Sequence, residues 1–127
     1  MILRNPAAVH KPLAAYSHQA EIGPEASWLV MSGQVGMNQD GSVPEDTMEQ
    51  MKTALDNVAF NLAAANMEKE NLVKLVFYFV GSHDAEKRRR VISDYFGEHR
   101  PCTTVIYVAG LANPALKVEI DAWACRE

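Results

Sequence analysis

The amino-acid sequence predicts an α/β (α+β) domain in which two helices cover one face of a mixed β-sheet. The chain has 127 residues, close to the commonest length of a single domain, and no linker or repeat divides it. Segments with strand patterns surround two segments with helical periodicity, in the order strands, helix, strand, helix, two strands. We therefore expect residues 1–127 to form one domain.

The first strands are predicted near the N-terminus. Polar and apolar residues alternate over Tyr16–Ile22, and the turn residues Gly23–Pro24 follow. The apolar run Trp28–Met31 precedes Ser32–Gly33 and predicts a strand that is buried on both faces. Asn, Asp, Gly and Ser are frequent in Met37–Val43, which predicts a loop.

The first helix is predicted to begin after Asp46. Glu49 stands three residues later, as in a capping box, and Asn66 is the expected end. Apolar residues recur at steps of three and four, which is typical of a helix packed on a sheet rather than of a cofactor site. They are Met48, Met51, Leu55, Val58, Leu62 and Ala65.

The second half of the chain alternates strand and helix. Val, Phe and Tyr are concentrated in Leu72–Val80, which predicts a strand that ends at Gly81. Asp84 is the expected cap of a second helix that runs through Phe96 and ends at Gly97. The last two predicted strands are Thr103–Val108 and Val118–Cys125.

Side chains of these last two strands alternate between two faces. Trp123, Tyr107 and Val105 are expected on the face away from the helices, where a monomer would expose them to water. We therefore predict an oligomer that closes sheet against sheet and encloses Glu119 and Thr103 at a subunit boundary. The residues expected beneath the helices are Val118, Ile120, Ala122 and Ala124 of the last strand and Thr104, Ile106 and Val108 of the other.

Composition excludes several classes of function. The net charge of -4 and the pI near 5.5 argue against a nucleic-acid binder, which needs a basic surface. No apolar run approaches the roughly 18–20 residues of a membrane span, and Met1–Pro6 lacks the pattern of a signal peptide. A cytoplasmic location without membrane contact is the prediction. Cys102 and Cys125 are interpreted as reduced apolar residues, and neither a metal nor a cofactor is expected.

Five segments, in order along nearly the whole chain, resemble the RidA/YjgF family, also called the endoribonuclease L-PSP family. They are Tyr16–Ala20, Ser32–Val35, the pair Gln50 and Asn57, Pro101 with Val105–Leu111, and Val118–Ala122. The resemblance implies a homotrimer of chorismate-mutase-like subunits with three clefts between neighbours. It also implies hydrolysis of reactive imines or enamines, released by pyridoxal-phosphate enzymes, to 2-oxo acids and ammonia. The expected ligand is a small carboxylate or imino acid.

The resemblance assigns candidate site residues. Tyr16 matches an aromatic hydroxyl that lines the cleft, and Ser32 and Gly33 match its polar wall. Glu119 matches the carboxylate that orients the attacking water, as general-base catalysis requires. The alternative for Glu119 is an interface-paired or solvated strand residue.

One position departs from the family pattern. Active deaminases carry an arginine that grips the substrate carboxylate, and Thr103 stands at that position in Pro101–Thr104. Loss of such a partner typically costs about 2–5 kcal/mol of binding. Two hypotheses follow: a deaminase with altered substrate preference, or a non-catalytic trimer that binds a small molecule. Endoribonuclease activity is not expected for so acidic a chain.

A basic run, Lys87–Arg90, lies in the second predicted helix. Residues about 100° apart pass around the whole helix, so these four cannot all face solvent. Arg88 and Arg89 lie three or four residues from the inward stripe, and Arg89 aligns with a family position that reaches the cleft. Arg89 is therefore a candidate anion anchor in place of residue 103. The alternatives are an interface salt bridge or a snorkelling side chain, and Arg100 is a second candidate.

Overall fold

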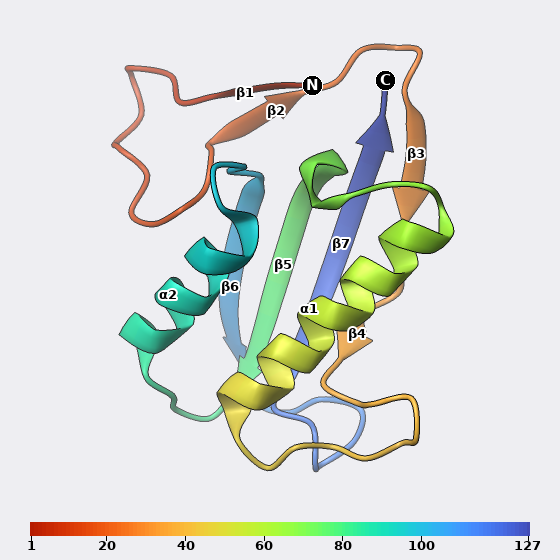
Figure 1. Ribbon diagram of the computed structural model, residues 1–127. Helices are drawn as coiled ribbons and strands as arrows, with labels where there is room; N and C mark the ends of the chain where they lie inside the picture. The colour runs from red at the N-terminus through yellow and green to blue at the C-terminus, as the bar shows by residue number, and fades with distance from the viewer.

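A computed structural model describes all 127 residues, and Figure 1 shows helices α1 and α2 in front of the main sheet. The elements are β1 (Ile2–Arg4), β2 (Gln19–Glu21), β3 (Ser27–Val30), β4 (Gln34–Val35), α1 (Thr47–Ala64), a 3-10 turn (Lys69–Asn71), β5 (Leu72–Val80), α2 (Ala85–Phe96), β6 (Cys102–Val108) and β7 (Val118–Arg126). No helix combines the length and the apolar character that crossing a membrane requires.

The main sheet has the strand order β3-β7-β5-β6, and β4 also pairs with β7. β5 and β6 are parallel, because α2 carries the chain back between them, whereas β7 is antiparallel to its neighbours. α1 and α2 cover the same face of this sheet (Figure 1). The predicted fold class, two helices on one face of a mixed sheet, is therefore confirmed.

Both helices begin where their caps predict. The Asp46 side chain accepts a hydrogen bond from the amide of Glu49 at 3.0 Å, and Asp84 accepts from the amides of Glu86 and Lys87. The chain leaves α2 through Gly97 at φ 62°, a conformation that glycine adopts without strain. The apolar stripe of α1 packs on β5 and β7, where it forms one core with Leu75, Phe77, Phe79, Val118, Ile120, Ala122 and Ala124.

The first predicted strand is shorter than expected. β2 begins only at Gln19, so Tyr16 and Ser17 lie in a loop. The amide of Ser17 donates to the carbonyl of Pro101, and the amide of His18 donates to the Asn5 side chain. Because these bonds lead to different parts of the chain, no strand ladder forms there. β2 instead pairs with β1, which the sequence pattern did not reveal.

The prediction that Trp28–Met31 is buried on both faces is wrong. β3 is an edge strand, and only the side of Leu29 packs on the core. Trp28 is 52% exposed and Val30 is 66% exposed on the other side. The continuous apolar run therefore predicted the strand correctly, but it did not predict which of the two faces is buried.

The face assignment of β6 is also wrong. The parallel register pairs Thr103 with Leu75, Val105 with Phe77 and Tyr107 with Phe79, and these β5 residues lie in the core under the helices. Thr103, Val105 and Tyr107 therefore lie on the helical face, and Thr104, Ile106 and Val108 lie on the open face. Each face of β6 mixes threonine with apolar residues, so alternation alone could not decide between them.

This register separates two residues that the sequence analysis expected together. Glu119 pairs with Tyr78 and lies on the open face of the sheet, opposite to the face that carries Thr103. The open face also presents Trp28, Val30 and Ile106 as exposed apolar side chains. The prediction of an oligomer that covers this face stays a prediction.

Candidate functional site

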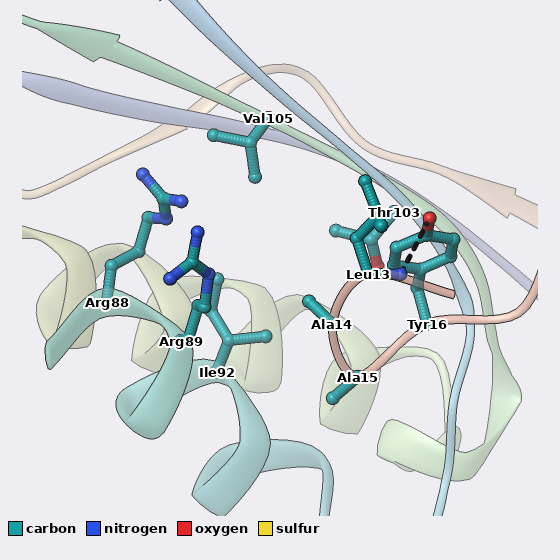
Figure 2. A pocket seen from close by; sticks show the side chains of 9 residues that line it. All are labelled: Leu13, Ala14, Ala15, Tyr16, Arg88, Arg89, Ile92, Thr103 and Val105. Atoms are coloured by element: carbon teal, nitrogen blue, oxygen red, sulfur yellow. Dashed lines mark hydrogen bonds between the residues drawn. The ribbon is translucent and has the colours of Figure 1, made fainter. Parts of the chain in front are cut away.

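A cavity of about 250 Å³ lies between α2, β6 and the loop that contains Tyr16 (Figure 2). Three of the residues proposed from the sequence, Tyr16, Thr103 and Arg89, line it together. The other lining residues are Leu13, Ala14, Ala15, Arg88, Ile92 and Val105. The cavity therefore has a mostly apolar wall with a hydroxyl end and a cationic side.

The hydroxyl end is built by backbone contacts. The Tyr16 hydroxyl accepts a hydrogen bond from the amide of Leu13 at 3.2 Å, drawn as a dashed line in Figure 2. The bond between the Ser17 amide and the Pro101 carbonyl ties this loop to the start of β6. Thr103 is half-buried, and its hydroxyl donates back to the Pro101 carbonyl at 3.3 Å. The threonine hydroxyl is thus engaged with its own backbone.

Arg88 supplies the buried cation of the cavity. Its side chain comes from α2, and the residue is only 8% exposed. Its Nη1 donates to the Tyr107 hydroxyl at 2.7 Å and contacts Nε2 of His83 at 3.0 Å. The guanidinium carbon lies 5.9 Å from the centre of the Phe79 ring. The ion pairs of the chain involve other groups, and Nε of Arg88 is buried without a hydrogen-bond partner.

His83 holds one side of this guanidinium. Burial lowers the pKa of the imidazole below its ordinary value of 6.5, and the charge of Arg88 lowers it further, whereas Asp84 acts in the opposite direction. The ring is therefore neutral at pH 7, so Nε2 accepts the arginine proton and Nδ1 carries the ring hydrogen. That Nδ1 is also buried without a partner.

The other arginines have different surroundings. Arg89 is exposed and points its guanidinium into the mouth of the same cavity (Figure 2). Arg90 lies 3.8 Å from Glu86 on the solvent side of α2. Arg100 donates to the carbonyls of Gly97 and His99 behind the helix end, and it does not line the cavity. Arg88 was noted in the sequence but not chosen, because Arg89 is the one that aligns with a family position at the cleft. The rotation of Arg88 toward β6 depends on how α2 packs.

The remaining predicted residues form a second cluster beside β4. A Cβ placed on Gly33 would lie 2.7 Å from Cδ of Glu119, so the bare glycine backbone is in contact with the carboxylate. The pairing of Val35 with Glu119 fixes this arrangement, and Ser32 precedes the glycine. Gly33 and Glu119 therefore lie in contact, with Ser32 next to them in the chain, and they lie outside the cavity of Tyr16 and Thr103.

Two side-chain amides of α1, from half-buried Asn57 and buried Gln50, hold the backbone near this cluster. Asn57 Nδ2 donates to the carbonyls of Val35 and Met37, each at 3.0 Å. Gln50 is fully buried and holds the two loops at that end of the sheet through bonds to the backbones of Pro44, Ala115 and Lys117. Both residues belong to the motifs that the sequence analysis matched: Asn57 supports the strand that follows Gly33, and Gln50 supports the neighbouring loops.

Tyr78 and Asp121 extend the polar surface around Glu119, and the sequence analysis assigned no site role to either. The Tyr78 hydroxyl donates to Asp121 at 2.9 Å. This hydrogen bond raises the pKa of Tyr78, and burial and the charges of Asp121 and Glu119 raise it further. The spacing of Glu119 and Asp121 at i and i+2 was the signal available in the sequence, since it puts both carboxylates on one face.

Comparison with known proteins gives a consistent result. The family model described as endoribonuclease L-PSP matches residues 7–126. The chain is 29% identical over 126 residues to the 2-iminobutanoate/2-iminopropanoate deaminase of Escherichia coli, across 91% of this chain and 98% of that one.

Solved structures agree. The Rid family protein YyfB of Yersinia pestis superimposes with a TM-score of 0.86 at 26% identity, over 98% of both chains. A structure of Escherichia coli TdcF with bound serine gives a TM-score of 0.73 at 27% identity, over 100% of this chain and 99% of that one. With the fold, the collinear motifs and the family model in agreement, the chain belongs to the RidA/YjgF (endoribonuclease L-PSP) family.

Proposed function

We propose that this protein is a hydrolytic deaminase of 2-imino acids that acts in a cleft between two copies of the chain. In this proposal one copy contributes the cavity of Tyr16, Thr103 and Arg88, and its neighbour contributes Glu119 with Ser32 and Gly33. Because the two clusters lie on opposite faces of one sheet, head-to-tail contacts would join unlike surfaces and close a ring, here a homotrimer. The contact between Gly33 and the Glu119 carboxylate is the observation that carries the proposal.

The chemistry needs one base and one anion site. Glu119 takes a proton from water as the water oxygen bonds to C2 of the imino acid, and the imine nitrogen gains a proton. The C2–N bond then breaks as the proton of the new hydroxyl passes to the nitrogen, so that the 2-oxo acid remains and the nitrogen leaves as ammonia. One water is consumed for each ammonia released. A carboxylate held rigidly by strand pairing beside bare backbone suits this task.

The second candidate is a trimer that binds a small molecule without turnover. Thr103 favours it, because the position lacks a cation and its hydroxyl bonds to its own backbone. An unanchored substrate carboxylate would cost about 2–5 kcal/mol of binding, which corresponds to tens- to thousands-fold in affinity. Deaminase activity toward small monocarboxylic imino acids is therefore expected to be weak.

Ammonia release separates the two candidates. An amino-acid oxidase generates 2-iminobutyrate in situ, and the rate of ammonia release is compared with and without the protein. We expect slow acceleration by the unmodified chain, loss of it in Glu119→Gln and a gain in Thr103→Arg. Acceleration that survives Glu119→Gln would contradict the assigned role of Glu119. If no imino acid, with or without Thr103→Arg, is deaminated faster while a 2-oxo acid still binds, the second candidate is correct.

RNA cleavage is a weaker alternative despite the name of the family. The chain is acidic, with a net charge of -4, and phosphate binding calls for a basic surface. The cytoplasmic location and the absence of nucleic-acid partners remain predictions from the sequence.

A further inference from the structure

We propose that Arg88 takes over the anion-binding role that Thr103 does not fill, and that Arg88 and Arg89 together select ligands with two negative groups. The substrate class would then be dicarboxylic 2-imino acids rather than small monocarboxylic ones. This inference rests on the proposed function, because it identifies what the same cleft accepts.

The first argument is the unbalanced charge of Arg88. An arginine that is 92% buried ordinarily has a carboxylate partner, since an unpaired buried charge is strongly destabilising. Arg88 has only a neutral imidazole, a phenol hydroxyl and an aromatic ring around it. Both hydrogen bonds leave from Nη1, and Nε has none. The guanidinium is thus held in place while part of its donor set is unused.

The second argument is the direction of the side chain. Arg88 and Thr103 line the same cavity from opposite elements, α2 and β6 (Figure 2). Arg88 lies toward the other end of the cavity from the small threonine, because its guanidinium contacts Tyr107, which is further along β6 than Thr103 (Figure 2). The cation is therefore supplied from the helix and not from position 103. His83 and Tyr107 act as positioning residues, because their contacts fix Nη1 and keep the guanidinium at the cavity wall.

The third argument is a second cation on the same wall. Arg89 lines the cavity and has no ion-pair partner, whereas the neighbouring Arg90 lies 3.8 Å from Glu86. No aspartate or glutamate is among the lining residues. Two positive charges therefore face one small cavity, one buried and one at its mouth.

These charges and the wall between them describe the ligand. Ile92, Val105 and Leu13 contribute apolar surface to the cavity, which suits a short hydrocarbon chain. A ligand with one carboxylate leaves the second arginine unpaired, and a ligand with two carboxylates a few carbons apart pairs both. Paired guanidinium–carboxylate contacts are among the strongest hydrogen bonds in proteins.

Calorimetry with stable 2-oxo acids tests this inference without any turnover. We expect 2-oxoglutarate to bind at least about 10-fold tighter than 2-oxobutyrate, a factor that one additional charge-assisted contact supplies. Arg89→Ala should lower the affinity for 2-oxoglutarate to that for 2-oxobutyrate, and it should leave the affinity for 2-oxobutyrate unchanged. Arg88→Met, which keeps much of the side-chain volume, should lower the affinity for both ligands at least about 10-fold.

Arg90→Ala is the matched control, because Arg90 lies on the same helix, is exposed and does not line the cavity. This variant should bind both 2-oxo acids with the affinities of the unmodified chain. Equal affinities for the two acids, or full 2-oxobutyrate binding by a folded Arg88→Met, would overturn the inference. If Arg88→Met does not fold, Arg88→Lys and the surface variant Arg89→Ala decide the question. Dicarboxylate selectivity without ammonia release would leave the inference standing and refute the deaminase proposal.

Discussion

Gly33→Ala should displace the Glu119 carboxylate and slow catalysis without unfolding the protein. The added Cβ would lie 2.7 Å from Cδ, 2.8 Å from Oε1 and 2.9 Å from Cγ of Glu119. Ordinary carbon contacts begin near 3.5 Å, so the carboxyl group must move by roughly 0.8 Å. Since misplacement of a catalytic group by about 1 Å costs on the order of 100-fold in rate, we expect kcat/KM to fall about 10- to 100-fold.

The assay is ammonia release at limiting imino acid, together with 2-oxo acid affinity by calorimetry. Affinity should change little, because the anion contacts lie on the other cluster. Gly110→Ala is the control, since nothing lies within 4 Å of a Cβ at that position, and its rate should match that of the unmodified chain. A Gly33→Ala variant with an unchanged rate would refute the argument that this glycine places the carboxylate.

Three further predictions concern stability, pH and assembly. Gln50→Leu should lower the free energy of unfolding by roughly 2–5 kcal/mol, measured by urea denaturation. The reason is that two carbonyls and one amide lose the hydrogen bonds that the buried side chain makes to them. A loss below about 1 kcal/mol would contradict this role. The lowered pKa of His83 means that the unfolded chain takes up a proton before the folded chain does, so stability should fall as pH drops below 6.5. His83→Leu should flatten that fall, and an identical pH profile in the variant would show that another group causes it. Mixed trimers made from equal amounts of Glu119→Gln and the cavity-blocking Thr103→Phe should recover about a quarter of the normal rate, since a quarter of the interfaces would have both halves intact; no recovery would place the site within one chain.

The sequence predicted the elements whose ends have local causes. α2 begins after Asp84 and ends at Gly97, and α1 begins after Asp46, because these residues form hydrogen bonds with the helix ends themselves. β5 also agrees with its predicted range, since its core positions carry large apolar side chains. The short strands β1 and β4 could not be predicted, because each forms only by pairing with a distant segment.

The site was predictable in part, and the missing parts depend on tertiary packing. Motif order identified Tyr16 and Glu119, but the sequence analysis placed Thr103 on the same face as Glu119. Which face each β6 residue takes is decided by the register with β5, which no local pattern in β6 encodes. Arg89 was chosen over Arg88 because it aligns with a family position at the cleft. The burial of Arg88 could not be predicted, since neighbours on a helix differ by about 100° and only the packing of α2 on β6 fixes the rotation.

The central claim is that one ligand is held between two copies of the chain, and a crystal structure with bound 2-oxoglutarate tests it most directly. We predict a ligand carboxylate against Arg88 in one subunit, with its carbonyl carbon facing Glu119 of the neighbouring subunit. The claim would be contradicted by a ligand that contacts neither residue, or by one enclosed entirely within a single chain.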